Sequence, residues 1–314
     1  MPNKNSVFRE LLNSDEVTRI VGVNDSIGGL LAERRGFDAL WASGLGISTA
    51  WGVPDASILT MTEMLQSASV VNRTCGLPVI SDCDTGFGDI NNARRMVREY
   101  EAAGISAVCI EDKEYPKRNS FRDGHRLADR YEFAARIAMV KEASEDPDFT
   151  VIARLESLIA GVGVDDAFDR ACRYTAAGAD AILVHSKAKT ADQVTEFAEL
   201  WRSRGGRVPV LVVPTTYPDI TIDELKNAGI SGVIYANQTL RASIHAMDEA
   251  LNSIQKNGTS LPIEPEISSV HEVFELTRTA EIEITESWFN KKVMELRGAE
   301  SPGTGRASFA EAIQ

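Results

Sequence analysis

The 314-residue sequence predicts an α/β fold, a single closed (β/α)8 barrel of the TIM type, and three observations support this prediction. Eight short apolar runs alternate with longer amphipathic segments, as in a parallel sheet covered by helices. A weak glycine repeat precedes every second run. The length also suits one α/β barrel, since such domains routinely reach about 250 residues.

The eight expected strands are short and almost continuously apolar, which is typical of strands buried on both faces. They are 19–23, 39–42, 77–80, 107–110, 150–153, 181–184, 208–213 and 232–235. The segments between them carry helical patterns, most clearly 92–103 and 165–177.

A glycine stands between a helical segment and the strand that follows it at four places. These glycines are Gly36, Gly104, Gly178 and Gly229. Glycine just past a helix is the usual left-handed cap, so the repeat could simply mark the ends of ordinary helices before the next strand. Its recurrence before strands two, four, six and eight favours a barrel over an open sheet.

The C-terminal region continues beyond the last expected strand. A helix is expected over 239–255, then a connector rich in glycine and proline, then a helix over 269–279. We expect one domain over residues 1–290 and a flexible tail over 291–314. A helix beyond a closed barrel must bury its apolar face, most simply on a neighbouring subunit, so we expect an oligomer.

Composition excludes several classes of partner. The 33 basic and 46 acidic residues give a net charge of -13, which argues against nucleic acid or an anionic membrane as a partner. The four cysteines have no CxxC spacing and are expected to be buried free thiols. Neither a signal-peptide core nor a run of about 18 apolar residues occurs, so a cytoplasmic protein is expected.

Carboxylates follow two neighbouring strands and predict a divalent-metal site. Asp82 and Asp84 follow the third strand, and Glu111 follows the fourth. Residues at i and i+2 share one face of a strand, and hard cations such as Mg²⁺ prefer oxygen ligands. The alternative is that Asp-x-Asp only caps a helix.

Other polar residues fall at expected strand ends, where barrels of this type place their active sites. Arg154 could bind a phosphoryl or carboxylate group bidentately, or could pair only with Glu156 or Glu111. His185 could be a site residue or a satisfied core histidine. The remaining candidates are Trp41, Ser43, Gly44 and Asn237, and the Ser43–Gly46 segment is either an ordinary turn or a backbone anion pocket.

A cationic loop follows Glu111 in this acidic chain. Its basic residues are Lys113, Lys117, Arg118, Arg122, His125 and Arg126. A solvated loop is the simple interpretation. Its length, its single Pro116 and its position above the carboxylates favour a lid that closes over the site and excludes water.

These residues resemble the phosphoenolpyruvate mutase branch of the isocitrate lyase superfamily, from about residue 21 to about residue 282. The most specific element is Glu111-Asp112-Lys113 followed, after five residues, by Asn119-Ser120, a pattern associated with the mutases. The supporting stretches are 41–45, 82–88, 152–156, 178–186 and 236–242.

The resemblance implies a barrel whose last helix is exchanged between the subunits of a homotetramer, and a requirement for Mg²⁺. It implies that Asp82 is the direct magnesium ligand. The residues implied to hold water around the ion are Asp55, Asp84 and Glu111. The substrate carboxylate would bind the backbone of Ser43, Gly44 and Leu45, beside Trp41 and Asn237. The groups implied around the phosphoryl group are Arg154, His185, Lys117, Asn119 and Ser120.

The implied reaction is that of an isomerase. It interconverts phosphoenolpyruvate and phosphonopyruvate by moving phosphorus between an oxygen and the methylene carbon, and no base needs to take a proton. One departure is Asn24, because the family commonly has histidine at the matching position of the first strand.

Three alternatives stay open. Stretches 52–60, 186–190 and 213–218 look more like the phosphonopyruvate hydrolases, which carry threonine where this lid has Asn119. A carbon-carbon lyase would carry a cysteine in its lid, and no cysteine lies between Cys109 and Cys172. A non-catalytic binding protein would lack the metal carboxylates.

Overall fold

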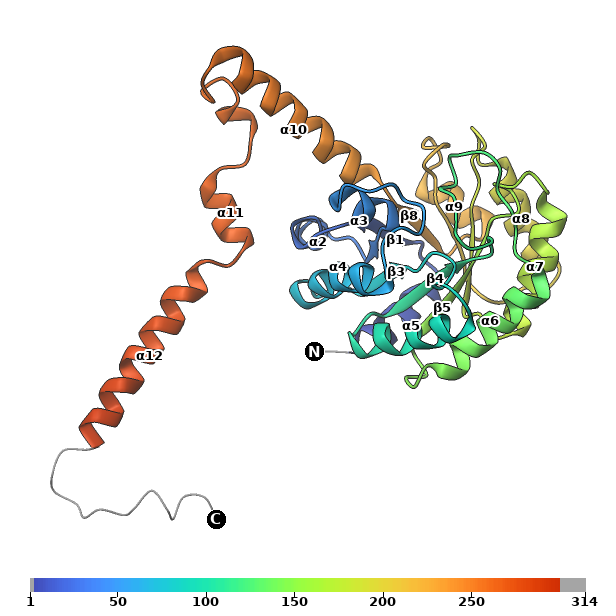
Figure 1. The fold of residues 1–314 in the computed structure, drawn as a ribbon, viewed down its shortest axis with the longest axis horizontal. Coiled ribbons are helices and arrows are strands. Elements are labelled where there is room, and N and C mark those ends of the chain that lie inside the picture. Colours follow the sequence, from blue (N-terminus) through green and yellow to red (C-terminus); the bar gives the residue numbers. More distant parts are fainter. Residues whose placement is uncertain (1–2, 300–314) are drawn as a thin grey trace. The chain divides into compact units, whose positions relative to one another are not determined.

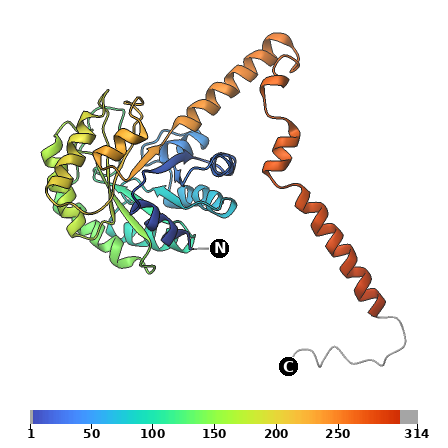
Figure 2. The ribbon, with the colours of Figure 1, turned by 180° about the vertical axis from the view of Figure 1, so that it is seen from behind.

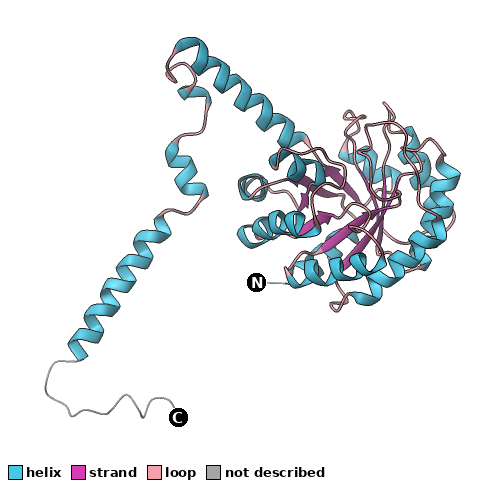
Figure 3. Cartoon of the chain, in the orientation of Figure 1, coloured by secondary structure: helices cyan, strands magenta, loops and turns pink. Residues whose placement is uncertain are grey.

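The computed structural model describes residues 3–299 and has a closed barrel of eight parallel strands in chain order (Figures 1 and 3). The barrel belongs to a compact unit that ends at Asp248, and a second unit begins at Glu249. The strands are β1 Thr18–Val23, β2 Ala39–Ala42, β3 Val79–Asp82, β4 Ala107–Glu111, β5 Thr150–Leu155, β6 Ala181–Val184, β7 Val210–Val212 and β8 Gly232–Tyr235. The predicted (β/α)8 barrel is therefore confirmed.

All eight predicted strands exist, but three of them continue further than their apolar runs. β3 extends to Asp82, β4 to Glu111 and β5 to Leu155, because the backbone N–H and C=O groups of a strand pair with the neighbouring strand whether the side chain is polar or apolar. The register pairs Glu111 with Arg154 on the neighbouring strand. The strand ends thus carry the acidic and basic groups into direct contact.

Helices cover the outside of the barrel (Figure 2). They are α2 Ser26–Arg34, α3 Gly44–Ala50, α4 Met61–Thr74, α5 Ile90–Ala102, α6 Arg130–Ala143, α7 Val164–Ala176, α8 Asp192–Ser203 and α9 Ile222–Ala228. The predicted helices 92–103 and 165–177 correspond to α5 and α7. All four glycines of the repeat have positive φ, between 74° and 103°, as expected for left-handed caps.

Helix α1, Lys4–Leu12, closes the end of the barrel opposite the site. Its Phe8 and Leu12 join the core inside the barrel, where Ile20 and Trp41 are also buried. Arg9 bonds Asp180 at 3.1 Å, just before β6, so α1 covers the amino ends of the strands. This helix is not among the elements predicted from the sequence.

The C-terminal helices carry many exposed apolar side chains. Helix α10, Gln238–Asn257, leads into the second unit, where α11 spans Val270–Leu276 and α12 spans Ala280–Ala299. The exposed apolar residues of α10 are Ile244, Met247, Leu251 and Ile254. Their spacing of three and four residues places them on one helical face. The helices predicted over 239–255 and 269–279 therefore exist.

The predicted domain over 1–290 and the predicted tail over 291–314 stay predictions. Residues 291–299 belong to α12, and 300–314 lie outside the described residues.

None of the helices within 3–299 has the length and apolarity needed to span a bilayer. The cysteines are free thiols as predicted, but Cys172 is exposed rather than buried because it lies on the outer face of α7.

Candidate active site

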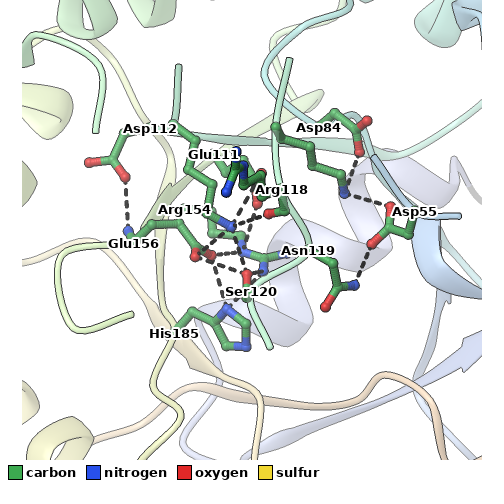
Figure 4. A network of polar contacts seen from close by, with 12 residues as sticks. Asp55, Asp84, Glu111, Asp112, Arg118, Asn119, Ser120, Arg154, Glu156 and His185 are labelled. Carbon is green, nitrogen blue, oxygen red and sulfur yellow. Dashed lines mark hydrogen bonds and ion pairs between the residues drawn. The ribbon is translucent and has the colours of Figure 1, made fainter. Parts of the chain in front are cut away.

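The residues predicted at the strand ends meet in one pocket at the carboxyl end of the barrel (Figure 4). The predicted residues that line it are Trp41, Ser43, Leu45, Asp55, Asp82, Lys117, Asn119, Ser120, Arg154, His185 and Asn237. Asp84, Glu111 and Gly44 lie directly behind this lining. A Cβ on Gly44 would stand 2.8 Å from Asp82 Oδ2, so glycine lets this carboxylate reach the pocket.

The lid lysine Lys117 lies between two of the predicted metal carboxylates. Its Nζ is 2.8 Å from Asp55 Oδ1 and 2.6 Å from Asp84 Oδ1, and its side chain is buried. Burial alone would lower the pKa of Lys117, but the charges of Asp84 and Asp55 hold it well above its usual value. The lid is therefore attached to the metal carboxylates through an ion-pair cluster.

Asn119 is fixed at both ends of its amide group. Its Nδ2 donates to Asp55 Oδ2 at 2.7 Å, and its Oδ1 accepts from Phe121 N at 3.1 Å. These two contacts assign the orientation of the amide, because only the nitrogen can donate to a carboxylate. Asn119 thus presents a neutral group to the pocket.

Arg154 is the centre of a buried network. Its Nε donates to Glu156 Oε1 at 2.5 Å, and its Nη2 lies 3.1 Å from Ser120 Oγ and 2.7 Å from His185 Nδ1. Lys113 Nζ lies 2.7 Å from Ser120 Oγ and 2.8 Å from Glu156 Oε2. Burial would raise the pKa of Glu156, yet the charge of Arg154 beside it keeps this pKa well below its usual value. Arg154 thus pairs with Glu156, as the alternative left open from the sequence has it, and its predicted anion role stays a prediction.

Glu111 has the properties of a carboxylate that awaits a cation. It is buried, and neither of its oxygens accepts a hydrogen bond from any residue that the structure describes. Burial raises the pKa of Glu111 to about 7, and the nearest cationic nitrogens, on Lys113 and Arg154, are 3.5 Å away. A buried acceptor without a donor is costly, so a bound cation would relieve it.

The acidic residues fit an ion that contacts few of them directly. Within residues 3–299, no three His, Cys, Asp or Glu side chains converge closely enough to hold a metal by themselves. Mg²⁺ commonly keeps several waters and binds through one or two carboxylates plus substrate oxygens. Asp82 in the pocket wall, with Asp55, Asp84 and Glu111 around it, matches this kind of site.

A strained loop carries Asp84, and the residue that holds this loop, Arg136, was not predicted from the sequence. Asp84 and Phe87 have φ values of 49° and 61°, which side-chain-bearing residues rarely adopt. Arg136 of α6 donates to Thr85 O at 2.6 Å and to Gly88 O at 2.8 Å. No local pattern could have revealed Arg136, because its partners lie about 50 residues earlier in the chain.

Ser43 caps the N-terminus of helix α3, and its Oγ accepts from Gly46 N at 3.2 Å. After β8, on the other side of β1, Asn237 Nδ2 donates to Thr215 Oγ1 at 3.2 Å. Its Oδ1 is buried and has no hydrogen-bond partner among the described residues. The Oδ1 atom of Asn237 is therefore available for a ligand.

The predicted lid lies over the carboxylates and has an ordered base. Glu114 N donates to Arg126 O, and Ala128 N donates to Asp112 O, both at 3.0 Å. The two ends of the lid, residues 112–114 and 126–128, therefore form a short antiparallel ladder, and we call them the two legs of the lid. Of the six basic residues of the loop, only Lys113 and Lys117 are buried. Residues 115–125 beyond the ladder form the part that could move, and this motion stays a prediction.

His185 is neutral in this network. Burial, together with the charge of Arg154, lowers the pKa of His185 to about 4. Its Nδ1 lies 2.7 Å from Arg154 Nη2 and 2.9 Å from Glu156 Oε1, and these contacts call for opposite tautomers. The edge of the ring meets Phe121 of the lid, with centroids 6.3 Å apart.

The shifted pKa of His185 predicts a loss of stability in acid. Between about pH 6.5 and about pH 4 the unfolded chain binds a proton that the folded state excludes, so stability falls as the pH falls. When the pH is lowered from about 7.5 to about 5, the free energy of unfolding should fall in both proteins. The fall should be about 2 kcal/mol smaller in His185→Gln, because this variant lacks the titrating imidazole. Urea titrations measure this difference, with exposed His271→Gln as the control. Equal losses in His185→Gln and the wild type would contradict the assignment.

Comparison with known proteins identifies the family. Residues 8–255 match the family model described as phosphoenolpyruvate phosphomutase, which is more than half of the chain. The chain belongs to the phosphoenolpyruvate phosphomutase family. The solved structure of a phosphoenolpyruvate phosphomutase from Streptomyces platensis subsp. rosaceus is 47% identical, with a TM-score of 0.89, and the alignment covers 91% of this chain and 99% of that one.

Two curated relatives show that overall identity does not separate the activities within this part of the superfamily. A phosphoenolpyruvate phosphomutase of Streptomyces hygroscopicus is 41% identical, covering 86% of each chain. A phosphonopyruvate hydrolase of Variovorax sp. is also 41% identical, covering 87% of this chain and 94% of the hydrolase. The phosphoenolpyruvate phosphomutase family therefore gives the scaffold, and the choice of reaction depends on individual residues of the site.

Proposed function

We propose that this protein is a phosphoenolpyruvate mutase, which interconverts phosphoenolpyruvate and 3-phosphonopyruvate and thereby forms the carbon-phosphorus bond needed for phosphonate biosynthesis. The observation that carries the proposal is the lid amide of Asn119, held at both ends between Asp55 and Phe121 N. A neutral amide in this position can donate to a phosphoryl group, whereas the resemblance gives the hydrolases a threonine at the matching position. We therefore favour transfer within the substrate over hydrolysis.

The pocket offers separate places for the two ends of the substrate. The backbone at Ser43–Leu45, between Trp41 and Asn237, would bind the carboxylate. The phosphoryl group would lie among the cationic and donor groups of the lid, of β5 and of the end of β6. These groups are Arg154, Lys117, His185, Asn119 and Ser120.

Intramolecular transfer breaks the bond from phosphorus to the enol oxygen and forms a bond from phosphorus to the methylene carbon. No proton is gained or lost in this exchange. The guanidinium of Arg154 would stabilise charge on the transferring group, as oriented donors do when they are fixed beforehand. The closed lid would keep water away from a loosely bonded phosphoryl group.

Mg²⁺ is the proposed cofactor, held by Asp82 with Asp55, Asp84 and Glu111 around it. The unpartnered buried oxygens of Glu111 support this assignment. When bound, the ion supplies charge that stabilises the pyruvyl enolate. The residues of the chain contribute the shape of the site and the position of the carboxylates.

Two other reactions of the superfamily are less well supported. Phosphonopyruvate hydrolysis to pyruvate and phosphate is the main alternative, since the scaffold is shared with a hydrolase. By the resemblance, a hydrolase would carry threonine at the position of Asn119. A carbon-carbon lyase would need a lid cysteine, and the chain has none between Cys109 and Cys172.

Homotetrameric assembly in the cytoplasm, with the last helices exchanged between subunits, completes the proposal. The apolar face of α10, formed by Ile244, Met247, Leu251 and Ile254, supports it because these side chains are exposed in the single chain. Large exposed apolar faces mark interaction sites.

Phosphorus NMR tests the reaction directly. With phosphonopyruvate and Mg²⁺, the signal of phosphoenolpyruvate should appear. Asn119→Ala should lower this rate by about 100-fold while phosphonopyruvate still binds, because the variant loses a donor that acts on the transferring group. Arg122→Ala, an exposed change in the same lid, should retain activity. Inorganic phosphate and pyruvate as the products of the wild type would decide for the hydrolase.

A further inference from the structure

We propose that Asp112, Arg170 and Tyr174 form a positioning network that sets the geometry of Arg154 and fixes one leg of the lid. None of the three touches the pocket, and none is a site candidate from the sequence. The inference rests on the proposed function for its kinetic test, but its structural test does not.

Asp112 follows β4 directly and brackets the end of β5. Its N–H donates to Arg154 O at 3.1 Å, and its Oδ1 accepts from Glu156 N at 2.8 Å (Figure 4). The backbone on both sides of Leu155 is thereby tied to one residue. Since the Glu156 carboxylate holds Arg154 and His185, the position of the guanidinium depends on Asp112.

Helix α7 holds the carboxylate of Asp112 in place. Asp112 Oδ2 accepts from Arg170 Nη1 at 3.1 Å and from Tyr174 OH at 2.9 Å. Arg170 Nη1 also lies 2.9 Å from Tyr174 OH. Asp112 and Tyr174 are fully buried and Arg170 nearly so, and a buried charged group is retained at a cost in desolvation. Well-packed apolar residues could hold α7 against the barrel, so the polar trio points to a geometric task.

The same residues fix the C-terminal leg of the lid. Ala128 N donates to Asp112 O at 3.0 Å, and Ala128 O accepts from Arg170 Nη1 at 3.0 Å. Arg130, two residues later, pairs with Asp166 at 2.7 Å, and Asp166 also accepts from Arg170 Nε at 2.8 Å. The lid therefore has one leg locked to α7, and its movable part is confined to the residues before Ala128.

The geometry thus connects two requirements of phosphoryl transfer. The guanidinium must be held at a fixed place, and the lid must return to one closed position. Asp112 contributes to both through the Glu156 N–H and through Ala128. Weakening the network should disturb transfer more than substrate binding.

Tyr174→Phe is the sharpest test because it removes one hydroxyl and keeps the packing. In the full-length protein, kcat should fall by about 3- to 10-fold with KM changed by less than about twofold. Hydrogen exchange at the amide of Glu156 should become about tenfold faster. Tyr100→Phe, the same change at a fully buried tyrosine of α5, is the matched control and should alter neither quantity.

Asp112→Asn gives a second, stronger test that keeps the size of the side chain. It should accelerate exchange at both Glu156 and Ala128 in the ligand-free protein. Unchanged exchange at both amides in both variants would overturn the proposal, whatever happens to activity. A wild type without mutase activity, combined with faster exchange in the variants, would support the network and remove only the proposed reaction.

Discussion

Arg154→Lys is expected to lower kcat by about 10²- to 10³-fold, although the positive charge is kept. Lysine cannot reproduce the planar fork with which Arg154 reaches Glu156, Ser120 and His185 at the same time. The ammonium could pair with Glu156, but it could not present a second nitrogen toward the pocket. The loss should therefore fall on the transfer step.

Steady-state kinetics with phosphonopyruvate, followed by phosphorus NMR, measure this effect. Arg173→Lys is a suitable control because Arg173 lies on the surface of α7 and pairs with Asp169 within one helix. It should retain nearly all activity. If Arg154→Lys kept more than about a third of the wild-type kcat, the guanidinium would not be the group that stabilises the transferring phosphoryl.

Asp82→Asn should weaken Mg²⁺ binding by more than about 100-fold and abolish turnover at ordinary magnesium concentrations. The change removes one charge and keeps the shape of the side chain, so the pocket should remain intact. Asp82 is one of two predicted metal carboxylates that line the pocket, together with Asp55, and Gly44 packs against it.

Isothermal titration with Mg²⁺ tests this prediction without any reaction. The matched control is Asp123→Asn in the lid, because the Asp123 side chain is fully exposed. Affinity for Mg²⁺ that is the same in Asp82→Asn and in the wild type would show that the ion binds elsewhere.

The parts of the structure that repeat or alternate could be predicted from the sequence. Each strand of the barrel appears as an apolar run in the sequence. Gly36 and Gly229 mark turns with a left-handed backbone conformation, which glycine adopts easily. Asp82 and Glu111 could be placed together because the carboxyl ends of parallel strands share one edge.

The contacts that complete the site could not be predicted in this way. The position of Lys117 between Asp55 and Asp84 depends on how the lid folds back over the strands. No periodic pattern in the sequence predicts this. Arg136 and Arg170 act from helices on backbone groups far away in the chain. Such contacts depend on three-dimensional packing, and a surface-helix arginine with this role looks like any other in the sequence.

Helix α1 affects how the enzyme can be shortened. Recognisable motifs begin near residue 21, and a boundary drawn there would appear safe from the alignment of motifs alone. Phe8 and Leu12 nevertheless fill the floor of the barrel beneath Ile20 and Trp41. A truncated version starting at the first motif would expose the interior of the barrel to solvent, so versions intended for crystallisation or engineering need helix α1 with its Phe8 and Leu12.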